Sequence, residues 1–280
     1  MAIYRLSETR ELVAPVLIAS FDGWVDAGSA ATLAADQIAE GGAVIATFDA
    51  DELFDYRARR PTLQIIDGQL RELSWPELTL RLSALGPRDV LVMSGPEPDY
   101  RWHAFAAAVI ELARRLRVVE WISLGAIPAA VPHTRPVPII GTASDPSRLR
   151  AGIVAGPEGI MRVPSAALSV LEMAMAAAGI PAVGYFAQVP HYVTGPSPAA
   201  ALALLDVLAD HLAMEIPRGQ LAEQARDIRT RLDLATAADE ATRAHVARLE
   251  ERADEEHPAS GDDLIADIER FLRDQGGGRG

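Results

Sequence analysis

Four loop segments of the sequence contain residue types that often do chemistry in proteins. The first covers residues 21–29, Phe-Asp-Gly-Trp-Val-Asp-Ala-Gly-Ser, between a short apolar run and a helical pattern. Ligands of open α/β sheets bind beyond the carboxyl ends of the strands, which is the expected position of this loop. Backbone amides at Gly23, Gly28 and Ser29 would then hold an anion at the N-terminus of the following helix. One interpretation of the segment is therefore an anion-binding loop.

The same loop has a structural interpretation. Asp22 and Asp26 would repel a phosphate, and the glycine spacing fits neither the dinucleotide-binding motif nor the phosphate-loop motif. Asp26 or Ser29 would instead cap the helix, because short polar side chains accept hydrogen bonds from the first helical amides. Trp24 would then pack at a contact between subunits or domains.

A second segment places Tyr100, Arg101 and Trp102 directly after a predicted strand. An arginine between aromatic residues can stack on a base or a sugar, which indicates a ligand site. Alternatively, Asp99 caps the helix that follows, and the aromatic side chains only anchor that helix.

Two further segments carry groups that could move a proton or bind an anion. In residues 132–136, two prolines flank His133, Thr134 and Arg135 and hold them in a short extended or turned segment. These side chains suit anion binding or general base catalysis, or equally a rigid edge at an oligomer contact. Glu158 lies in a glycine-flanked turn, where it is either a catalytic acid or part of a structural turn.

The composition excludes several classes of chemistry. The chain has no cysteine, and every one of its 26 basic residues is arginine, so thiolate nucleophiles, cysteine-bound metals and lysine-based catalysis are absent. No two histidines have a metal-binding i, i+4 spacing, and we expect neither a metal nor a cofactor. With 39 acidic residues the net charge is −13, which disfavours a nucleic-acid partner.

The sequence also gives an expectation for the cellular location of the protein. Its first residues lack the basic and apolar regions of a signal peptide. The longest apolar runs fall well short of the roughly 20 residues that span a bilayer. We therefore expect a cytoplasmic protein with no membrane association.

Hydrophobic periodicity predicts the elements that position these loops. Strands are predicted at residues 14–20, 44–48, 63–66, 70–73, 90–93, 119–124, 137–140, 152–155 and 180–189. Helices are predicted at residues 27–40, 100–115, 165–178 and 198–214. Asp67-Gly68 is typical of a hairpin turn, and residues 77–82 alternate in a way that would extend that hairpin. This order predicts the α/β class, as a three-layer α/β/α domain with a mixed central sheet.

The composition changes at about residue 217, which separates two predicted parts. Residues 1–217 are expected to form the α/β/α core. Residues 219–256 contain no proline, and their apolar positions recur at helical spacing, which predicts a helical hairpin that turns near 233–239. This hairpin and a short terminal helix make up residues 218–275, and residues 276–280 are expected to be disordered.

Three collinear motifs carry a resemblance to a known family. Residues 21–28, residues 132–136 and the closing stretch 260–273 resemble the proteasome assembly chaperone two (PAC2) family in its bacterial long form. The similarity covers most of the chain and is most specific at the first motif.

The resemblance implies a core similar to the phosphorylase/hydrolase-like fold, a C-terminal helical hairpin and self-association, with a trimer as the expected state. Eukaryotic and archaeal members are assembly factors that bind proteasome α-type subunits through C-terminal segments with a hydrophobic–Tyr–x ending. The present sequence ends Gly-Gly-Gly-Arg-Gly, so the resemblance does not extend to docking through such a tail.

Our leading hypothesis is a homo-oligomeric, non-enzymatic assembly-chaperone-like or scaffold protein, with a possible protein partner. The alternative is a phosphorylase/hydrolase-like enzyme or small-anion-binding sensor that uses the loops at the carboxyl ends of the strands. In it, Arg101 or Arg135 clamps a phosphate or carboxylate, and His133 or Glu158 handles protons. A third hypothesis is an adaptor that acts through the acidic helical hairpin.

Overall fold

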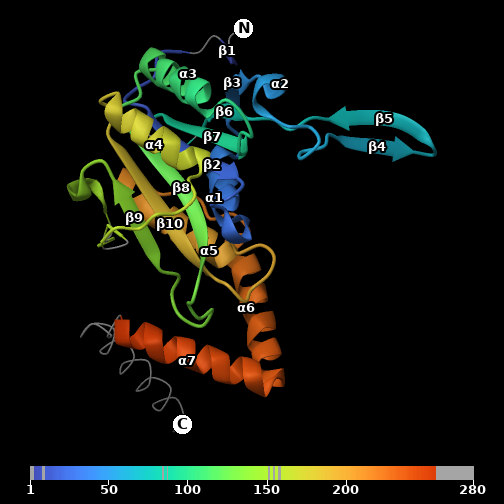
Figure 1. The fold of residues 1–280 in the computed structure, drawn as a ribbon, viewed down its shortest axis with the longest axis vertical. Helices are drawn as coiled ribbons and strands as arrows, with labels where there is room; N and C mark the ends of the chain where they lie inside the picture. Colours follow the sequence, from blue (N-terminus) through green and yellow to red (C-terminus); the bar gives the residue numbers. More distant parts are fainter. Residues whose placement is uncertain are drawn as a thin grey trace, which may run out of the picture. The chain divides into compact units, whose positions relative to one another are not determined.

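The computed structural model describes residues 3–7, 10–83, 85–86, 88–150, 152–153, 155–156 and 159–256 (Figure 1). The chain divides into two compact units, and each is described by itself. The first contains residues 1–129 and 137–227, and the second contains residues 130–136 and 228–280. The predicted domain boundary at residue 217 stays a prediction.

An eight-stranded mixed sheet forms the centre of the first unit. Its order is β1 (Tyr4–Leu6), β3 (Ala43–Phe48), β6 (Thr79–Leu82), β7 (Val90–Pro96), β2 (Val16–Asp22), β8 (Glu120–Ala129), β10 (Ala182–Pro190) and β9 (Ile139–Ala143). The four strands β7, β2, β8 and β10 run parallel to one another. The strands outside these four pair antiparallel. The carboxyl ends of the parallel strands therefore meet at one edge of the sheet.

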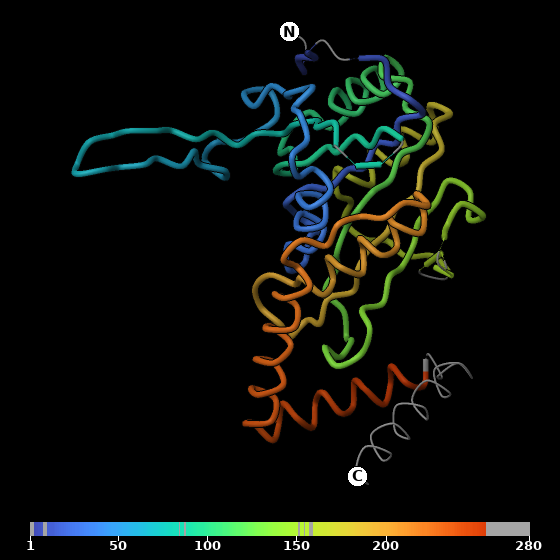
Figure 2. The backbone as a smooth tube through the Cα atoms, turned by 180° about the vertical axis from the view of Figure 1, so that it is seen from behind, coloured from blue at the N-terminus to red at the C-terminus, as the bar shows by residue number. Residues whose placement is uncertain are grey.

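Helices cover both faces of this sheet, which confirms the predicted three-layer α/β/α class (Figures 1 and 2). Helices α1 (Ala30–Ala39) and α5 (Pro198–Leu212) pack on one face, and α3 (Trp102–Arg115) and α4 (Ala167–Ala177) pack on the other. The short helix α2 (Ala50–Leu53) follows β3. Residues of β2 alternate between the two apolar layers and are almost all buried, as expected for a central parallel strand.

The predicted hairpin is confirmed, but its predicted third strand lies elsewhere. Strands β4 (Thr62–Ile66) and β5 (Gln69–Ser74) form a separate two-stranded sheet, and Asp67 and Gly68 both have the positive φ of a type I′ turn. Residues 79–82 do not extend this hairpin, because they pair with β3 and β7 in the central sheet as β6. Burial of the apolar side chain at Leu80 in the core explains this choice.

A second difference concerns the edge of the sheet near β9. This strand begins after the predicted start at residue 137, because Pro136 and Pro138 have no amide hydrogen to donate to a neighbouring strand. The predicted strand at 152–155 is reduced to one isolated bridge between Gly141 and Ala155. Gly152 has a φ of 68°, which is a turn conformation.

The second unit contains α7 (Glu240–Glu256) and the part of α6 (Leu221–Ala238) that begins at Ile228. They are joined at Asp239, whose carboxylate accepts a hydrogen bond from the amide of Thr242 at 2.7 Å. The predicted terminal helix, the predicted tail and Glu158 lie outside the described residues. Within the described part of the chain, no helix has the length and apolar character needed to cross a membrane.

Candidate functional site

Asp26 holds the loop that follows β2. Its carboxylate accepts hydrogen bonds from the amides of Ala31 and Thr32, at 2.8 and 3.3 Å, and from the Thr32 hydroxyl at 2.5 Å. Burial raises the pKa of Asp26 above its ordinary value, although these hydrogen bonds act in the opposite direction. The amides at the start of α1 therefore already donate hydrogen bonds to the Asp26 carboxylate, and an external anion would have to displace it.

The glycines and the serine of this loop have conformational roles. Gly28 has a φ of 62°, and a Cβ atom there would lie 2.8 Å from the Cβ of Ser197. Ser29 is also left-handed, with a φ of 49°, and its side chain makes no capping hydrogen bond to α1. The tight turn therefore accounts for these two residues without a ligand.

Glu97 is a buried carboxylate that the sequence analysis missed. Its Oε1 accepts a hydrogen bond from the amide of Ala167 at 2.7 Å, and its Oε2 accepts one from the amide of Trp24 at 3.1 Å. A Cβ atom at Gly23 would lie 2.6 Å from Oε2, so only glycine fits there. Glu97 thus ties the loop after β2 to the start of α4. The feature of the sequence that could have indicated Glu97 is its position shortly after the predicted buried strand at residues 90–93.

The aromatic segment after β7 packs against α2. The amide of Tyr100 donates to the carbonyl of Leu53 at 3.1 Å, and Arg101 forms an ion pair with Glu52. The indole of Trp102 donates to the carbonyl of Pro98 at 2.6 Å. These contacts anchor the segment, but the predicted cap is wrong. Asp99 does not cap α3, because its carboxylate instead accepts hydrogen bonds from the amide of Asp55 at 2.9 Å and from Arg59 at 3.3 Å.

Trp24 and Asp22 remain at the surface of the first unit. The Trp24 side chain is 66% exposed, although its backbone is held by Glu97. Asp22, the last residue of β2, is exposed as well and lines a pocket described below. A large exposed indole beside a rigid loop suits a contact with another protein.

The segment with His133, Thr134 and Arg135 belongs to the second unit. Arg135 donates from Nε and Nη2 to the two carboxylate oxygens of Asp254, each at 2.8 Å. Thr134 donates to Glu250, to which Arg135 also donates at 3.3 Å.

His133 ties the same segment to the other helix of this unit. Its Nε2 lies 3.2 Å from a carboxylate oxygen of Asp233, and its carbonyl accepts a hydrogen bond from Arg229 at 2.8 Å. Burial lowers the pKa of His133. All three predicted site residues of this segment thus bind side chains of α6 or α7. The other predicted site residues that the structure describes belong to the first unit.

The hairpin of β4 and β5 is an exposed arm of the first unit, and its apolar face was not expected (Figures 1 and 2). The register pairs Leu63 with Leu73 and Ile65 with Leu70, so these four side chains share one face. Each is between 43% and 71% exposed. A two-stranded hairpin is marginally stable alone and needs its apolar face covered. This face is therefore a candidate protein-binding surface.

Comparison with known proteins adds the family. The model of the PAC2 family matches residues 20–235, which include the loop after β2, the arm and all strands from β3 onward. The chain belongs to the PAC2 family. This confirms the resemblance carried by the sequence motifs. A comparison with curated protein sequences finds no match.

Solved PAC2-like structures cover nearly the whole chain. A protein of unknown function from Corynebacterium glutamicum is 32% identical, with a TM-score of 0.82 over 91% of this chain and 98% of the other. A Mycobacterium tuberculosis proteasome-assembly chaperone homologue is 35% identical, with a TM-score of 0.75 over 82% and 99%. Pyrococcus furiosus PbaB, an archaeal proteasome activator, is 15% identical and shows a common fold, with a TM-score of 0.66 over 84% and 98%.

Proposed function

We propose that this PAC2 protein is a non-enzymatic scaffold of the assembly-chaperone kind and that it acts as a homo-oligomer. The observation that carries the proposal is the arm, whose apolar face is exposed along both strands. The similarity to a proteasome-assembly chaperone homologue at 35% identity supports the same function. Neither argument requires a reaction.

The arm suits contact with a second copy of the chain. Its apolar face consists of Leu63, Ile65, Leu70 and Leu73, while the opposite face carries polar pairs such as Gln64 with Glu72. An amphipathic ribbon of this kind gains stability when a protein surface covers only the apolar side. An arm that docks on a different surface of a neighbour can make a head-to-tail contact, which closes into a ring when the rotation between neighbours allows it. We propose that three copies form such a ring.

The oligomer is tested with a pair of double variants on opposite faces of the arm. Ile65→Thr with Leu70→Thr removes apolar surface and leaves a residue of high strand propensity at both positions. Gln64→Thr with Glu72→Thr is the matched control. Light scattering after size-exclusion chromatography at micromolar concentration should give a multiple of 29.9 kDa for the wild type and the control, and 29.9 kDa for the apolar-face variant. A monomeric wild type, or an apolar-face variant of unchanged mass, contradicts the oligomer.

The chaperone part needs its own assay. Purified proteasome α-type subunits are mixed with the wild type or the apolar-face variant, and complex formation is followed on native gels and by light scattering. We expect the wild type to form a defined complex and to change the rate at which the subunits assemble. An intact oligomer that leaves both the complexes and the rate unchanged contradicts a proteasome-directed chaperone, while the oligomer result stands.

A further inference from the structure

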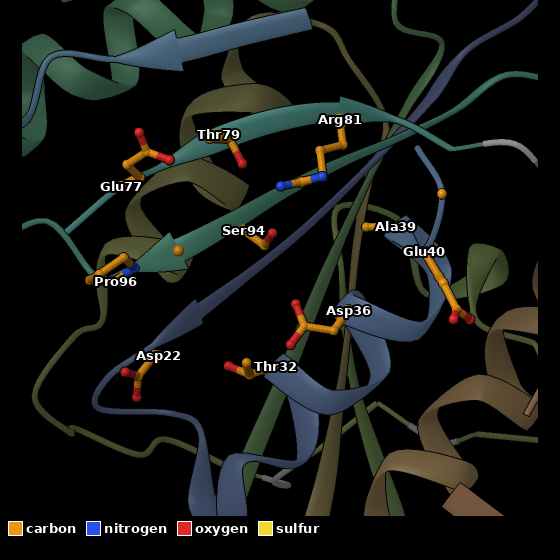
Figure 3. A pocket seen from close by; sticks show the side chains of 12 residues that line it. Asp22, Thr32, Asp36, Ala39, Glu40, Glu77, Thr79, Arg81, Ser94 and Pro96 are labelled. Atoms are coloured by element: carbon orange, nitrogen blue, oxygen red, sulfur yellow. The ribbon is translucent and has the colours of Figure 1, made fainter. Parts of the chain in front are cut away.

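A pocket of about 440 Å³ lies on the first unit beside α1 (Figure 3). Its lining comes from α1 and the two residues after it, from β6 and the nearby Glu77, and from the ends of β2 and β7. The lining residues are Asp22, Thr32, Asp36, Ala39, Glu40, Gly41, Glu77, Thr79, Arg81, Ser94, Gly95 and Pro96.

Sheet geometry explains why polar side chains face this pocket. Helices α1 and α5 pack over β2, β8 and β10, whereas β6 continues the sheet beyond α1. Thr79 pairs with Ser94 across β6 and β7, and Arg81 follows Thr79 two residues later on the same face. Gly95 has a φ of 145°, and a Cβ atom there would lie 2.2 Å from the carbonyl oxygen of Glu77. Only glycine allows this rim to close so tightly.

Two opposite charges face each other across the pocket without touching. The guanidinium of Arg81 and the carboxylate of Asp36 both point into the space in Figure 3. Within the part of the chain that the structure describes, Asp36 accepts no hydrogen bond and neither side chain forms an ion pair. Arg81 makes one long hydrogen bond, from Nη1 to the carbonyl of Gly42 at 3.5 Å. Burial raises the pKa of Asp36, although the charge of Arg81 acts in the opposite direction. A ligand with both a positive and a negative group would satisfy both walls.

The remaining charges favour a ligand whose net charge is positive. The lining contains four carboxylates, at Asp22, Asp36, Glu40 and Glu77, and one guanidinium. The C-terminal end of α1 also borders the pocket, and the partial negative charge of a helix C-terminus attracts cations. A second positive group on the ligand would therefore be attracted by the excess negative charge of the lining.

Ser20 is a buried hydroxyl residue on the strand next to the pocket lining. The residue is 1% exposed, and its Oγ has no hydrogen-bond partner among the described residues. Strand alternation places Ser20 on the same face of β2 as Asp22, and its register partner on β7 is Ser94, a lining residue. Ser20 is not a lining residue and its Oγ is inaccessible, so a ligand in the pocket would not contact it. The observations that indicate a ligand are therefore the charges of the lining.

We propose that this pocket binds a small zwitterion of net positive charge, the chemical class of the basic amino acids. The ligand's carboxylate lies against Arg81 and the hydroxyls of Thr79 and Ser94. Its α-ammonium group binds Asp36, and its second cationic group binds one of the outer carboxylates, Asp22 or Glu77. This inference is independent of the proposed function, because the pocket lies within one chain.

The test uses three probes that differ by one charged group each. L-Lysine has all three groups, norleucine lacks the side-chain ammonium, and 1,5-diaminopentane lacks the carboxylate. Isothermal titration of the full chain should show L-lysine binding at least about tenfold more tightly than either of the others. Equal affinity for L-lysine and 1,5-diaminopentane would mean a general cation surface, and no binding of L-lysine at millimolar concentration would mean no such site. Either result overturns the proposal.

Variants connect the binding to the pocket. Arg81→Gln should weaken L-lysine at least about tenfold and leave 1,5-diaminopentane unchanged or tighter, whereas Asp36→Asn should weaken both. Glu72→Gln on the arm is the control, with unchanged affinity. Thermal denaturation of each variant is measured to check that the chain is folded. Unchanged L-lysine affinity in the folded Arg81→Gln and Asp36→Asn variants places any binding elsewhere and overturns the proposal, and it leaves the oligomer and chaperone results untouched.

Discussion

At the scale of single residues, the loop after β2 shows a carboxylate that serves the fold. Asp26 accepts hydrogen bonds from two amides at the start of α1 and from the Thr32 hydroxyl. These bonds satisfy helix amides that would otherwise be unpaired. Burial nevertheless disfavours the ionised carboxylate, because its pKa is raised. The cap and the charge therefore have opposite effects on stability.

Two substitutions separate these effects. Asp26→Ala removes the cap and should lower the free energy of unfolding by about 1 kcal/mol. Asp26→Asn keeps an acceptor and removes the charge. Because the folded-state pKa is raised, the stabilisation from protonated Asp26 is complete below pH 3.8 and is lost as the pH rises through the folded-state pKa. In urea unfolding, the free energy of unfolding of Asp26→Asn should therefore increase relative to that of the wild type as the pH rises through the folded-state pKa of Asp26. A difference in free energy of unfolding between Asp26→Asn and the wild type that does not change with pH would contradict a raised pKa of Asp26.

At the scale of elements, the arm is a local structure with few ties to the core. All residues of β4 and β5 are exposed, and their hydrogen-bonded partners are each other. Its turn depends on Gly68, whose φ of 76° is unfavourable for any residue with a Cβ atom. A change in this turn should therefore affect the arm and leave the sheet intact.

Gly68→Val tests this independence, because a β-branched residue strains the turn most. Backbone hydrogen exchange of residues 62–74 should become faster, while the midpoint of global urea unfolding of a dilute, monomeric sample stays the same. Gly41→Ala is a comparison at a positive-φ glycine outside the arm, and exchange in the arm should not respond to it. Unchanged exchange in the Gly68→Val arm would show that contacts other than the turn hold the strands together.

At the scale of the whole molecule, charged side chains organise the second unit. Arg135 bridges Asp254 and Glu250 on α7, and His133 contacts Asp233 on α6. The hydrogen bond and the charge of Arg135 lower the pKa of Asp254, although desolvation acts in the opposite direction. The depressed pKa means that this contact stabilises the unit above pH 3.8 and loses its effect as the pH falls through the folded-state pKa.

Arg135→Gln should release the segment 130–136 from α7 while the first unit keeps its stability. The protection of α7 amides against hydrogen exchange, relative to their intrinsic exchange rates, should fall severalfold at neutral pH. Acidification of the wild type through the folded-state pKa of Asp254, which lies below 3.8, should lower this protection in the same way. Arg248→Gln, at an exposed arginine on the same helix, is the matched control. Equal acceleration in the two variants would mean that loss of helix charge, rather than loss of the bridge, is responsible.

The family and most individual elements could be predicted from the sequence. Apolar runs, helical spacing and the Asp67-Gly68 turn depend on neighbours in the chain, so they predicted most helices and strands of the first unit between β2 and α5 close to their observed positions. The motif at 21–28 indicated the PAC2 family, which the match over residues 20–235 confirms. These features are local, and local features can be read from a linear sequence.

The pairing of the strands and the contents of the sites were decided only by the tertiary structure. Residues 79–82 pair in the central sheet because burial of their apolar side chains in the core stabilises the fold more than a third strand on an exposed arm would. The carboxylate of Glu97 and the facing charges of Asp36 and Arg81 come from segments far apart in the chain. Residues 133–135 found their partners about a hundred positions away. Such contacts depend on packing between distant segments, which no short-range pattern encodes.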